Sequence, residues 1–269
     1  MAKTFCLITG ASSGIGRALA IHLSRNNVGV FAIARRKEGL EETKSLGDSD
    51  NIFPVVADVT SKDGRQNIVQ AVEQSGNKIH YLVQNAGIMG TVSKAINVDE
   101  ESWRMAFEVN VHAPFFLTQA MVPLMAENSR ILHIGSGAAY NAMDGWSPYC
   151  TTKAAFLMMY NCLKNELAPH KIFVGSVKPG IVESPMQETI RASKAEDMEL
   201  LDMFKGFKEN EYSGPAEDKP HKPPTGGLDT ASNVAFFLDF LLNETSDKEF
   251  SESEWDIRDE DHHSRWIKE

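Results

Sequence analysis

A tyrosine and a lysine one helical turn apart are the first residues whose spacing suggests chemistry. Tyr149 is followed four residues later by Lys153, and residues 151–159 contain no Gly or Pro and are rich in helix formers. Residues i and i+4 of a helix lie on one face. An ammonium about 4 Å from a phenol, at an effective dielectric constant of about 20, favours the phenolate by roughly 4 kcal/mol, or about three pKa units. The spacing therefore predicts a tyrosine that exchanges a proton near neutral pH.

A serine hydroxyl is predicted to face this pair. The apolar run at 130–134 indicates a buried strand, and the strand stops at Gly135, Ser136 and Gly137. A hydroxyl at the end of that strand could hold the reacting oxygen of a substrate. Because a tyrosine and a lysine at this spacing also occur by chance on solvated helix surfaces, the interpretation depends on the rest of the chain.

A glycine-rich turn near the N-terminus predicts a phosphate-binding site. Residues 4–9 form an apolar strand, Gly10, Gly14 and Gly16 follow it, and residues 17–25 have a helical pattern. Glycines let the backbone turn tightly and approach a ligand, while a helix N-terminus offers free N–H groups and partial positive charge. The spacing differs from the G-x-G-x-x-G of other dinucleotide folds, but its place at the start of a strand–helix–strand unit favours a nucleotide.

The end of the second predicted strand indicates which nucleotide binds. Residues 28–33 form this strand, and Arg35 and Arg36 follow it, with Glu38 as the nearest acid and Arg17 on the preceding helix. A carboxylate at this point would accept the ribose 2′-hydroxyl of NAD, whereas an arginine fork accepts a 2′-phosphate. We therefore expect NADP as the cofactor, the alternative being a solvated basic turn.

The remaining strands and helices alternate along the chain. Further strands are expected at 52–57, 79–84, 130–134, 171–177 and 250–259, and helices at 62–75, 100–128, 150–168 and 231–242, the second of them broken or kinked near Pro114 and Pro123. This alternation, with binding residues at strand ends, predicts an α/β fold. We expect a doubly wound, Rossmann-type parallel sheet that binds its ligand at the carboxyl edge.

Length and composition fit one soluble domain. The chain has 269 residues, of which 42% are hydrophobic, so a single domain over 1–269 is expected. The net charge of −10 argues against a nucleic-acid partner. Three cysteines without paired or metal-like spacing fit a reducing compartment, and no apolar run is long enough for a signal sequence or a membrane helix. We expect a cytoplasmic protein.

Residues 183–228 differ from the rest and are expected to form a lid over the substrate. They begin with apolar residues at helical spacing and continue into a Pro- and Gly-rich stretch at 214–227. The apolar residues are Met186, Ile190, Met198, Leu201 and Phe204. A disordered surface loop without a role is the alternative. The adjacent His262 and His263 could bind a metal, but a solvated terminus is the favoured interpretation.

With these parts in order, the chain resembles the classical short-chain dehydrogenase/reductase family over nearly its whole length. The matching residues are Thr9, Gly10, Gly14, Gly16, Asp58, Asn85, Ala86, Gly87, Asn110, Ser136, Tyr149, Lys153, Pro179 and Gly180. The resemblance implies a catalytic set of Asn110, Ser136, Tyr149 and Lys153. Tyr149 would protonate a carbonyl oxygen, Lys153 would lower the pKa of the tyrosine and bind the nicotinamide ribose, and Asn110 would support a proton relay.

The resemblance also implies a cofactor site. Asp58 would meet the adenine amino group, and Ser184 keeps the hydroxyl of the threonine that usually follows Pro-Gly. The expected NADP-binding residues are Gly10, Ser12, Ser13, Gly14, Ile15, Gly16, Arg35, Arg36, Asp58, Val59, Asn85, Ala86, Gly87, Tyr149, Lys153, Pro179, Gly180, Ile181 and Ser184. Pairing through the two long helices, which gives a homodimer or homotetramer, is expected by the same analogy.

Within the family, the chain is similar to the sepiapterin reductase and benzil reductase branch. This similarity implies an NADPH-dependent reduction of a bulky ketone or diketone. The expected substrate residues are Ser136, Trp146, Tyr149, Met186 and Asp256, although Asp256 could equally be an ordinary surface acid. The alternatives are an NADP-linked alcohol or steroid dehydrogenase working in oxidation, and a non-catalytic NADP-binding regulator.

Overall fold

A parallel seven-stranded sheet forms the centre of the molecule. The computed structural model describes residues 3–210, 212 and 219–267. It confirms the predicted doubly wound α/β fold, with strand order β3-β2-β1-β4-β5-β6-β7 and every pair parallel. The strands are β1 Phe5–Thr9, β2 Gly29–Ala34, β3 Ile52–Val56, β4 Ile79–Gln84, β5 Met125–Ile134, β6 Ile172–Lys178 and β7 Trp255–Asp256.

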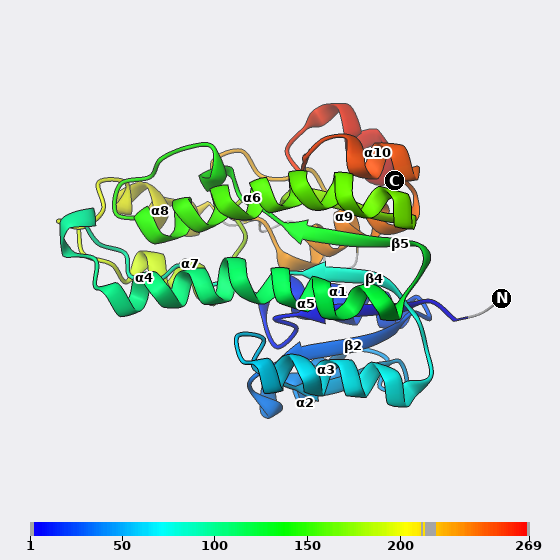
Figure 1. Cartoon of the computed structure of the whole chain (residues 1–269). Coiled ribbons are helices and arrows are strands. Elements are labelled where there is room, and N and C mark those ends of the chain that lie inside the picture. The colour runs from blue at the N-terminus through cyan, green and yellow to red at the C-terminus, as the bar shows by residue number, and fades with distance from the viewer. Residues whose placement is uncertain (1–2, 211, 213–218, 268–269) are drawn as a thin grey trace.

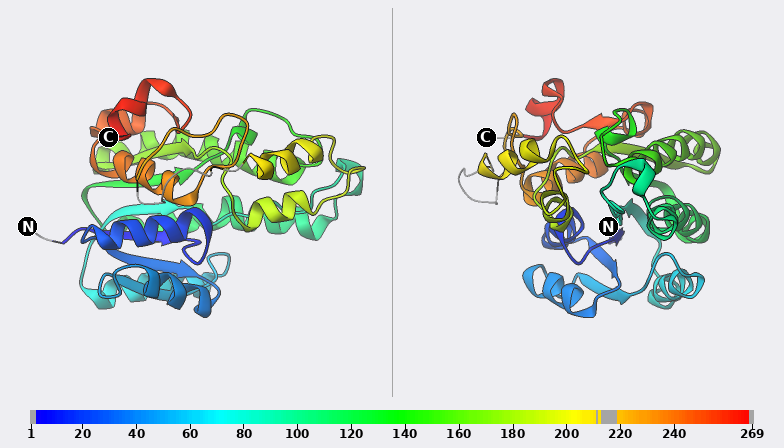
Figure 2. Two further views of the ribbon diagram at one scale, coloured as in Figure 1. Left: turned by 180° about the vertical axis from the view of Figure 1, so that it is seen from behind. Right: turned by 90° about the vertical axis from the view of Figure 1, so that its left-hand side faces the viewer.

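Helices cover both faces of the sheet (Figure 2). The helices α1 Gly14–Arg25, α2 Lys37–Leu46 and α9 Ala231–Asn243 pack on one face, and α3 Lys62–Ser75, α5 Ala113–Met121 and α6 Ser147–Leu167 pack on the other. Side chains of β1 alternate between the two layers, since Cys6 and Ile8 belong to the first apolar cluster and Phe5 and Leu7 to the second. Such burial on both faces explains why the strands read as continuous apolar runs.

The strand order reverses beside β1, which lies between β2 and β4. In an open parallel sheet, ligands bind at the carboxyl ends of the strands at such a point. The helices α7 Pro185–Arg191 and α8 Leu201–Glu209 lie beyond those carboxyl ends (Figure 1). The fold therefore brings the glycine turn, the other strand ends and the expected lid to one side.

The expected lid contains two helices where the apolar spacing suggested one. Ile190 of α7, Leu201 and Phe204 of α8, and Met198 between the two helices are buried in a third cluster, which also contains Tyr149. The Glu183 carboxylate, at the base of this segment, forms ion pairs to α7 and α8. The chain returns through a bridge between residues 182 and 229. The first part of the Pro- and Gly-rich stretch, 214–218, lies outside the described residues, as do residues 211 and 213.

The long helix expected at 100–128 is divided, and its last residues belong to a strand. It consists of α4 Glu100–Phe107, a π-helical turn Glu108–His112, α5, and a 3-10 turn Val122–Leu124. The prediction of a break near Pro114 is confirmed, because a proline cannot donate the helical hydrogen bond. The expectation of helix over 125–128 is wrong, because β5 already pairs with β4 at Met125.

The C-terminal segment also differs from the expectation. Only Trp255–Asp256 of the strand expected at 250–259 is a strand, and it follows α10 Asp247–Glu252, which begins at a capping box of Ser246 and Glu249. The tail is only partly solvated, because Ile257, His263 and Trp266 are buried while residues 258–261 are exposed. Trp266 in α11 His263–Trp266 packs against Phe237 at 5.1 Å between ring centroids.

Among the described residues, the two adjacent histidines of the tail do not belong to a group of metal ligands. His263 is buried with Nε2 at 2.9 Å from the Ile257 carbonyl oxygen. Within residues 3–210, 212 and 219–267, no three His, Cys, Asp or Glu side chains are grouped as metal ligands. In the same part of the chain, none of the helices combines the length and apolarity that crossing a bilayer requires.

Candidate active site

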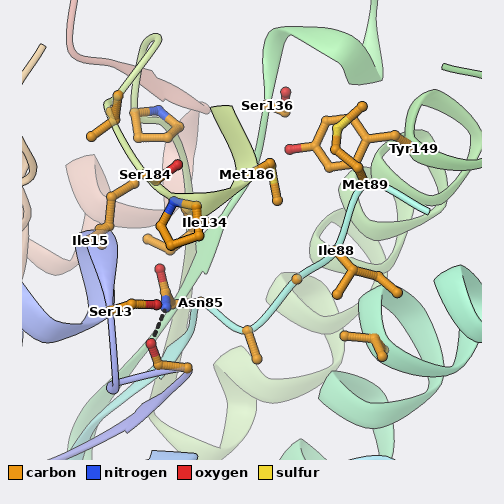
Figure 3. A pocket seen from close by; sticks show the side chains of 18 of the residues that line it. Ser13, Ile15, Asn85, Ile88, Met89, Ile134, Ser136, Tyr149, Ser184 and Met186 are labelled. Carbon is orange, nitrogen blue, oxygen red and sulfur yellow. Dashed lines mark hydrogen bonds between the residues drawn. The ribbon is translucent and has the colours of Figure 1, made fainter. Parts of the chain in front are cut away.

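One cavity of about 620 Å³ opens at the carboxyl edge of the sheet and gathers most of the predicted residues (Figure 3). Gly16, Asn110 and Asp256 lie outside its lining. The predicted residues that line it are Gly10, Ser12, Ser13, Gly14, Ile15, Arg35, Arg36, Asp58, Val59, Asn85, Ala86, Gly87, Ser136, Trp146, Tyr149, Lys153, Pro179, Gly180, Ile181, Ser184 and Met186. Residues far apart in the chain therefore share one elongated site.

The glycine turn forms one wall. Gly10 and Gly14 have φ of +70° and +53°, a region that disfavours any residue with a Cβ. At Gly16 a Cβ would lie 2.5 Å from Nδ2 of Asn85, so this glycine allows close packing below the turn. Ser13 is extended at the N-cap of α1, and Gly14 and Ile15 of the first turn, where a helix has free N–H groups, line the cavity. The turn fits the phosphates of a dinucleotide.

The end of β4 is fixed to the end of β1 by hydrogen bonds. Asn85 Nδ2 donates to the Thr9 carbonyl oxygen at 2.8 Å, and the backbone N–H groups of Asn85 and Ala86 both donate to Thr9 Oγ1 at 3.0 Å. Asn85, which belongs to the family pattern, thus links the ends of β1 and β4 by hydrogen bonds. It holds the small residues after β4 against the glycine turn.

Basic residues lie at the far end of the cavity. Arg35 and Arg36 are exposed and line it beside Asp58. Burial raises the pKa of Asp58, but hydrogen bonds from Thr60 and the charge of Arg35 outweigh burial and leave the pKa below its usual value. Arg17, considered as an additional cation, is already engaged, because its Nη2 donates to the Ser12 carbonyl oxygen and to Glu42.

The predicted catalytic side chains meet at the opposite end of the cavity. Tyr149 and Lys153 lie in the first turns of α6, and the Tyr149 hydroxyl points toward Ser136 (Figure 3). Lys153 Nζ donates to the carbonyl oxygen of Ile134 at 2.7 Å and lies 5.6 Å from the centroid of the Tyr149 ring. The Tyr149 phenol and the Ser136 hydroxyl therefore face each other, and the Lys153 amine lies beside the tyrosine ring.

The expected effect of the lysine on the tyrosine is wrong in this structure. Burial raises the pKa of Tyr149 to about 12, and hydrogen bonding with Ser136 only partly opposes this rise. Burial also lowers the pKa of Lys153 to about 8. Desolvation dominates both groups because each lies in the core. The sequence estimate assumed a partly solvated pair and therefore gave the opposite sign.

Asn110 lies beneath the site at the π-helical turn. Its Nδ2 donates to the Ile88 carbonyl oxygen at 2.8 Å and to Thr152 Oγ1 at 2.9 Å, and its Oδ1 accepts from Ile88 N at 2.9 Å. These bonds connect the end of β4 to α6, next to Lys153. A π-bulge is a frequent feature of functional sites.

The end of the cavity beside Tyr149 has an apolar lining, to which the segment expected to form a lid contributes. The Trp146 ring packs edge-on against Tyr149 at 5.9 Å and against Phe204 of α8 at 5.1 Å. Phe204 also lines the cavity, with Met186 of α7 beside it. The segment expected to form a lid therefore packs over Trp146, and Trp146 packs against the tyrosine.

The structure brings Arg258, instead of Asp256, to the cavity. Asp256 forms an ion pair with Lys178 at 3.0 Å, while Arg258 lines the cavity and lies beside Gly180. Sequence reasoning missed Arg258, Gln187 and Asn141, which also line it. No spacing rule in the sequence marks these residues. The fold of the C-terminal segment places Arg258, α7 places Gln187, and the turn after β5 places Asn141.

Comparisons with known proteins agree with this site. A family model described as short chain dehydrogenase matches residues 4–195, which include the glycine turn and the tyrosine–lysine pair. A 3-oxoacyl-(acyl-carrier-protein) reductase from Thermotoga maritima is 33% identical over 189 residues, covering 69% of this chain and 76% of that protein.

Two further similarities extend over more of the chain. Benzil reductase ((S)-benzoin forming) from Bacillus cereus is 28% identical over 216 residues, covering 76% of this chain and 86% of that protein. The crystal structure of a short-chain dehydrogenase/reductase from Saccharomyces cerevisiae, 26% identical, has a TM-score of 0.83 and covers 98% of this chain and 100% of its own.

Proposed function

Because the chain belongs to the short-chain dehydrogenase family, whose members are nicotinamide-dependent oxidoreductases, we propose that it is an NADPH-dependent carbonyl reductase. The proposed substrates are bulky ketones or diketones of the sepiapterin or benzil kind. One observation carries the proposal: Tyr149, Ser136 and Lys153 line the same cavity as the glycine turn. Similarity to the benzil reductase supports the substrate class.

The residues of the chain have separate tasks in this reaction. A reduced nicotinamide bound along the cavity supplies the hydride. Ser136 donates a hydrogen bond to the substrate oxygen, and Tyr149 gives it a proton as negative charge develops there. Lys153 stabilises the phenolate that remains. The apolar cover formed by Trp146 and Phe204 excludes water, which strengthens these electrostatic interactions.

The choice of NADPH rests on charge. Arg35 and Arg36 offer two guanidinium groups beside Asp58 at the adenosine end. A guanidinium can bind a phosphate through two parallel hydrogen bonds. We therefore assign the pair to the 2′-phosphate.

Assembly and location form part of the same proposal. Met105 of α4, Phe115 of α5 and Met158 of α6 are exposed on neighbouring helices, which favours a homodimer or homotetramer. Three free cysteines, one of them exposed, favour the reducing cytoplasm.

Consumption of NADPH with a panel of carbonyl compounds tests the function. We expect turnover of benzil, sepiapterin and related diketones, and a loss of about 10²- to 10⁴-fold in kcat for Tyr149→Phe, because the general acid is removed. Tyr81→Phe is the matched control, since that hydroxyl bonds Asn243 away from the cavity.

The panel also separates the alternatives. Equal inactivity of wild type and Tyr149→Phe on every carbonyl compound, with tight binding of NADPH, would overturn the reductase and favour a non-catalytic binding protein. Faster turnover of alcohols with NADP than of ketones with NADPH would instead favour a dehydrogenase working in oxidation.

A further inference from the structure

A carboxylate lies directly behind the strand end that carries Ser136. Glu254 lies between α10 and β7, and its Oε1 accepts a hydrogen bond from Ser176 Oγ at 2.9 Å. A Cβ on Gly135 would lie 2.7 Å from the same oxygen. Since Gly135 connects Ile134 to Ser136, the carboxylate packs against the backbone that shapes the catalytic end of the cavity.

This carboxylate faces the same side of the sheet as the catalytic helix. His133 of β5 and Ser176 of β6 are paired residues, so their side chains share one face. The His133 ring stacks on Phe156 of α6, with ring centroids 4.3 Å apart. Ser176 therefore holds Glu254 on the α6 side, where Lys153 is buried.

The charge on Glu254 reaches several neighbours because one oxygen of its carboxylate is shielded from water. Its Oε2 is buried, and a charge acts over longer distances where the dielectric constant is low. Burial and, after it, Glu254 raise the pKa of both Tyr140 and Tyr160 to about 12. At Lys153 burial lowers the pKa to about 8, and Glu254 is the group that opposes burial.

The other charged or titratable groups around Glu254 are either neutral or paired with an opposite charge. Lys178 of β6 pairs with Asp256 of β7 at 3.0 Å. Tyr160 of α6 donates its hydroxyl to the Ser251 carbonyl oxygen at 2.9 Å. Burial, helped by Lys153, lowers the pKa of His133 to about 3 and keeps that ring neutral.

We propose that Glu254 is a positioning residue for the reaction, which acts through Lys153 by favouring its ammonium form at the Ile134 carbonyl. The proposal rests on the proposed carbonyl reductase function. A buried lysine loses its charge easily, because burial removes the hydration of the ammonium. A fixed carboxylate behind β5 offsets that loss without entering the cavity or touching the substrate.

Glu254→Gln tests the charge alone, because an amide oxygen can still accept from Ser176. In the proposed reaction, Tyr149 must hold its proton and Lys153 must be an ammonium. Without Glu254 the lysine gives up its proton at lower pH. We expect the alkaline limb of the pH profile of kcat/KM to move down by roughly half a unit to one unit, with a three- to tenfold loss above it.

Three further variants complete this test. Glu254→Asp keeps the charge and should restore at least half of the displacement. Glu252→Gln removes an exposed carboxylate of α10 and should leave the profile unchanged. If Glu254→Gln does not fold, Ser176→Ala, which frees the carboxylate from its hydrogen bond, should move the limb in the same direction by a smaller amount.

A direct titration of Lys153 separates this proposal from the proposed function. Lysines labelled with ¹³C at Cε are titrated by NMR, and the Lys153 signal is assigned by its loss in Lys153→Met. A lower midpoint in Glu254→Gln supports the role of Glu254 even if no carbonyl compound is turned over, in which case only the reductase function fails. An unchanged midpoint, with activity reduced equally at every pH, would show a purely structural role and overturn the proposal.

Discussion

At the scale of single residues, we propose that the side chains after β2 distinguish the 2′-phosphate of NADP from the 2′-hydroxyl of NAD. Arg35→Asp replaces a cation beside Asp58 with an anion, which repels a 2′-phosphate and accepts a 2′-hydroxyl instead. Loss of charge-assisted hydrogen bonds costs roughly 1.5–3 kcal/mol, so we expect kcat/KM for NADPH to fall about ten- to a hundredfold. The value for NADH should stay constant or rise.

The neighbouring Lys37 supplies a control for that substitution. It is an exposed cation outside the lining of the cavity, so Lys37→Asp changes the net charge equally without touching the nucleotide site. Steady-state kinetics with both nucleotides compare the two variants. Selectivity that stays the same in Arg35→Asp would mean that Arg36 or another group reads the phosphate.

Residue identities in the site were predictable to the extent that they depend on local spacing. The glycine turn, Ser136 and the pair Tyr149 and Lys153 are each marked by a strand end or a helical period. The sign of the Tyr149 pKa shift was not predictable, because burial depends on the Trp146 and lid packing that only the folded chain provides. Arg258 was missed because only the fold of the C-terminal segment brings it beside Gly180 in the cavity lining.

At the scale of elements, strong periodic segments were predictable and their boundaries were less so. The helix at 62–75 agrees with α3, which begins at the Ser61 cap and ends at Gly76. The start of β5 was misassigned, because its strand pairing begins at Met125, which lies opposite Ile79 of β4, and the local sequence does not reveal this long-range contact. The C-terminal tail was misjudged because its burial depends on α9, which supplies the surface for Trp266.

The helix α8 should govern substrate affinity more than cofactor affinity. Phe204 is buried against Trp146 and lines the cavity. Phe204→Ala opens a void over the tyrosine, so we expect KM for a bulky diketone to rise roughly three- to thirtyfold, the equivalent of about 1–2 kcal/mol of lost apolar contact. The dissociation constant of NADPH, measured by fluorescence titration, should change less than twofold.

A neighbour on the same helix provides the matched control for α8. Met203 is 42% exposed, and Met203→Ala should leave KM unchanged because it removes surface side-chain atoms only. Equal effects of Phe204→Ala and Met203→Ala would contradict a role of α8 in covering the substrate.

At the scale of the whole molecule, exposed apolar side chains on α4, α5 and α6 predict how copies of the chain assemble. Met105, Phe115 and Met158 are 44%, 42% and 62% exposed, and the three helices lie on the same side of the sheet (Figure 1). In a dimer with two-fold symmetry, both subunits would bury these three side chains in the same interface. Wild type should therefore elute as a dimer or tetramer of the 29.8 kDa chain in light-scattering chromatography.

Charge placed on this helical face should dissociate the assembly. The double variant Phe115→Glu and Met158→Glu brings like charges together across the axis, since each copy contributes both, and burying unpaired carboxylates is costly. We expect a monomer with little change in secondary structure by circular dichroism. Leu46→Glu, at a similarly exposed apolar residue at the end of α2, should keep the wild-type mass. A wild-type monomer, or a double variant that keeps the wild-type mass, would place any association on another face of the molecule.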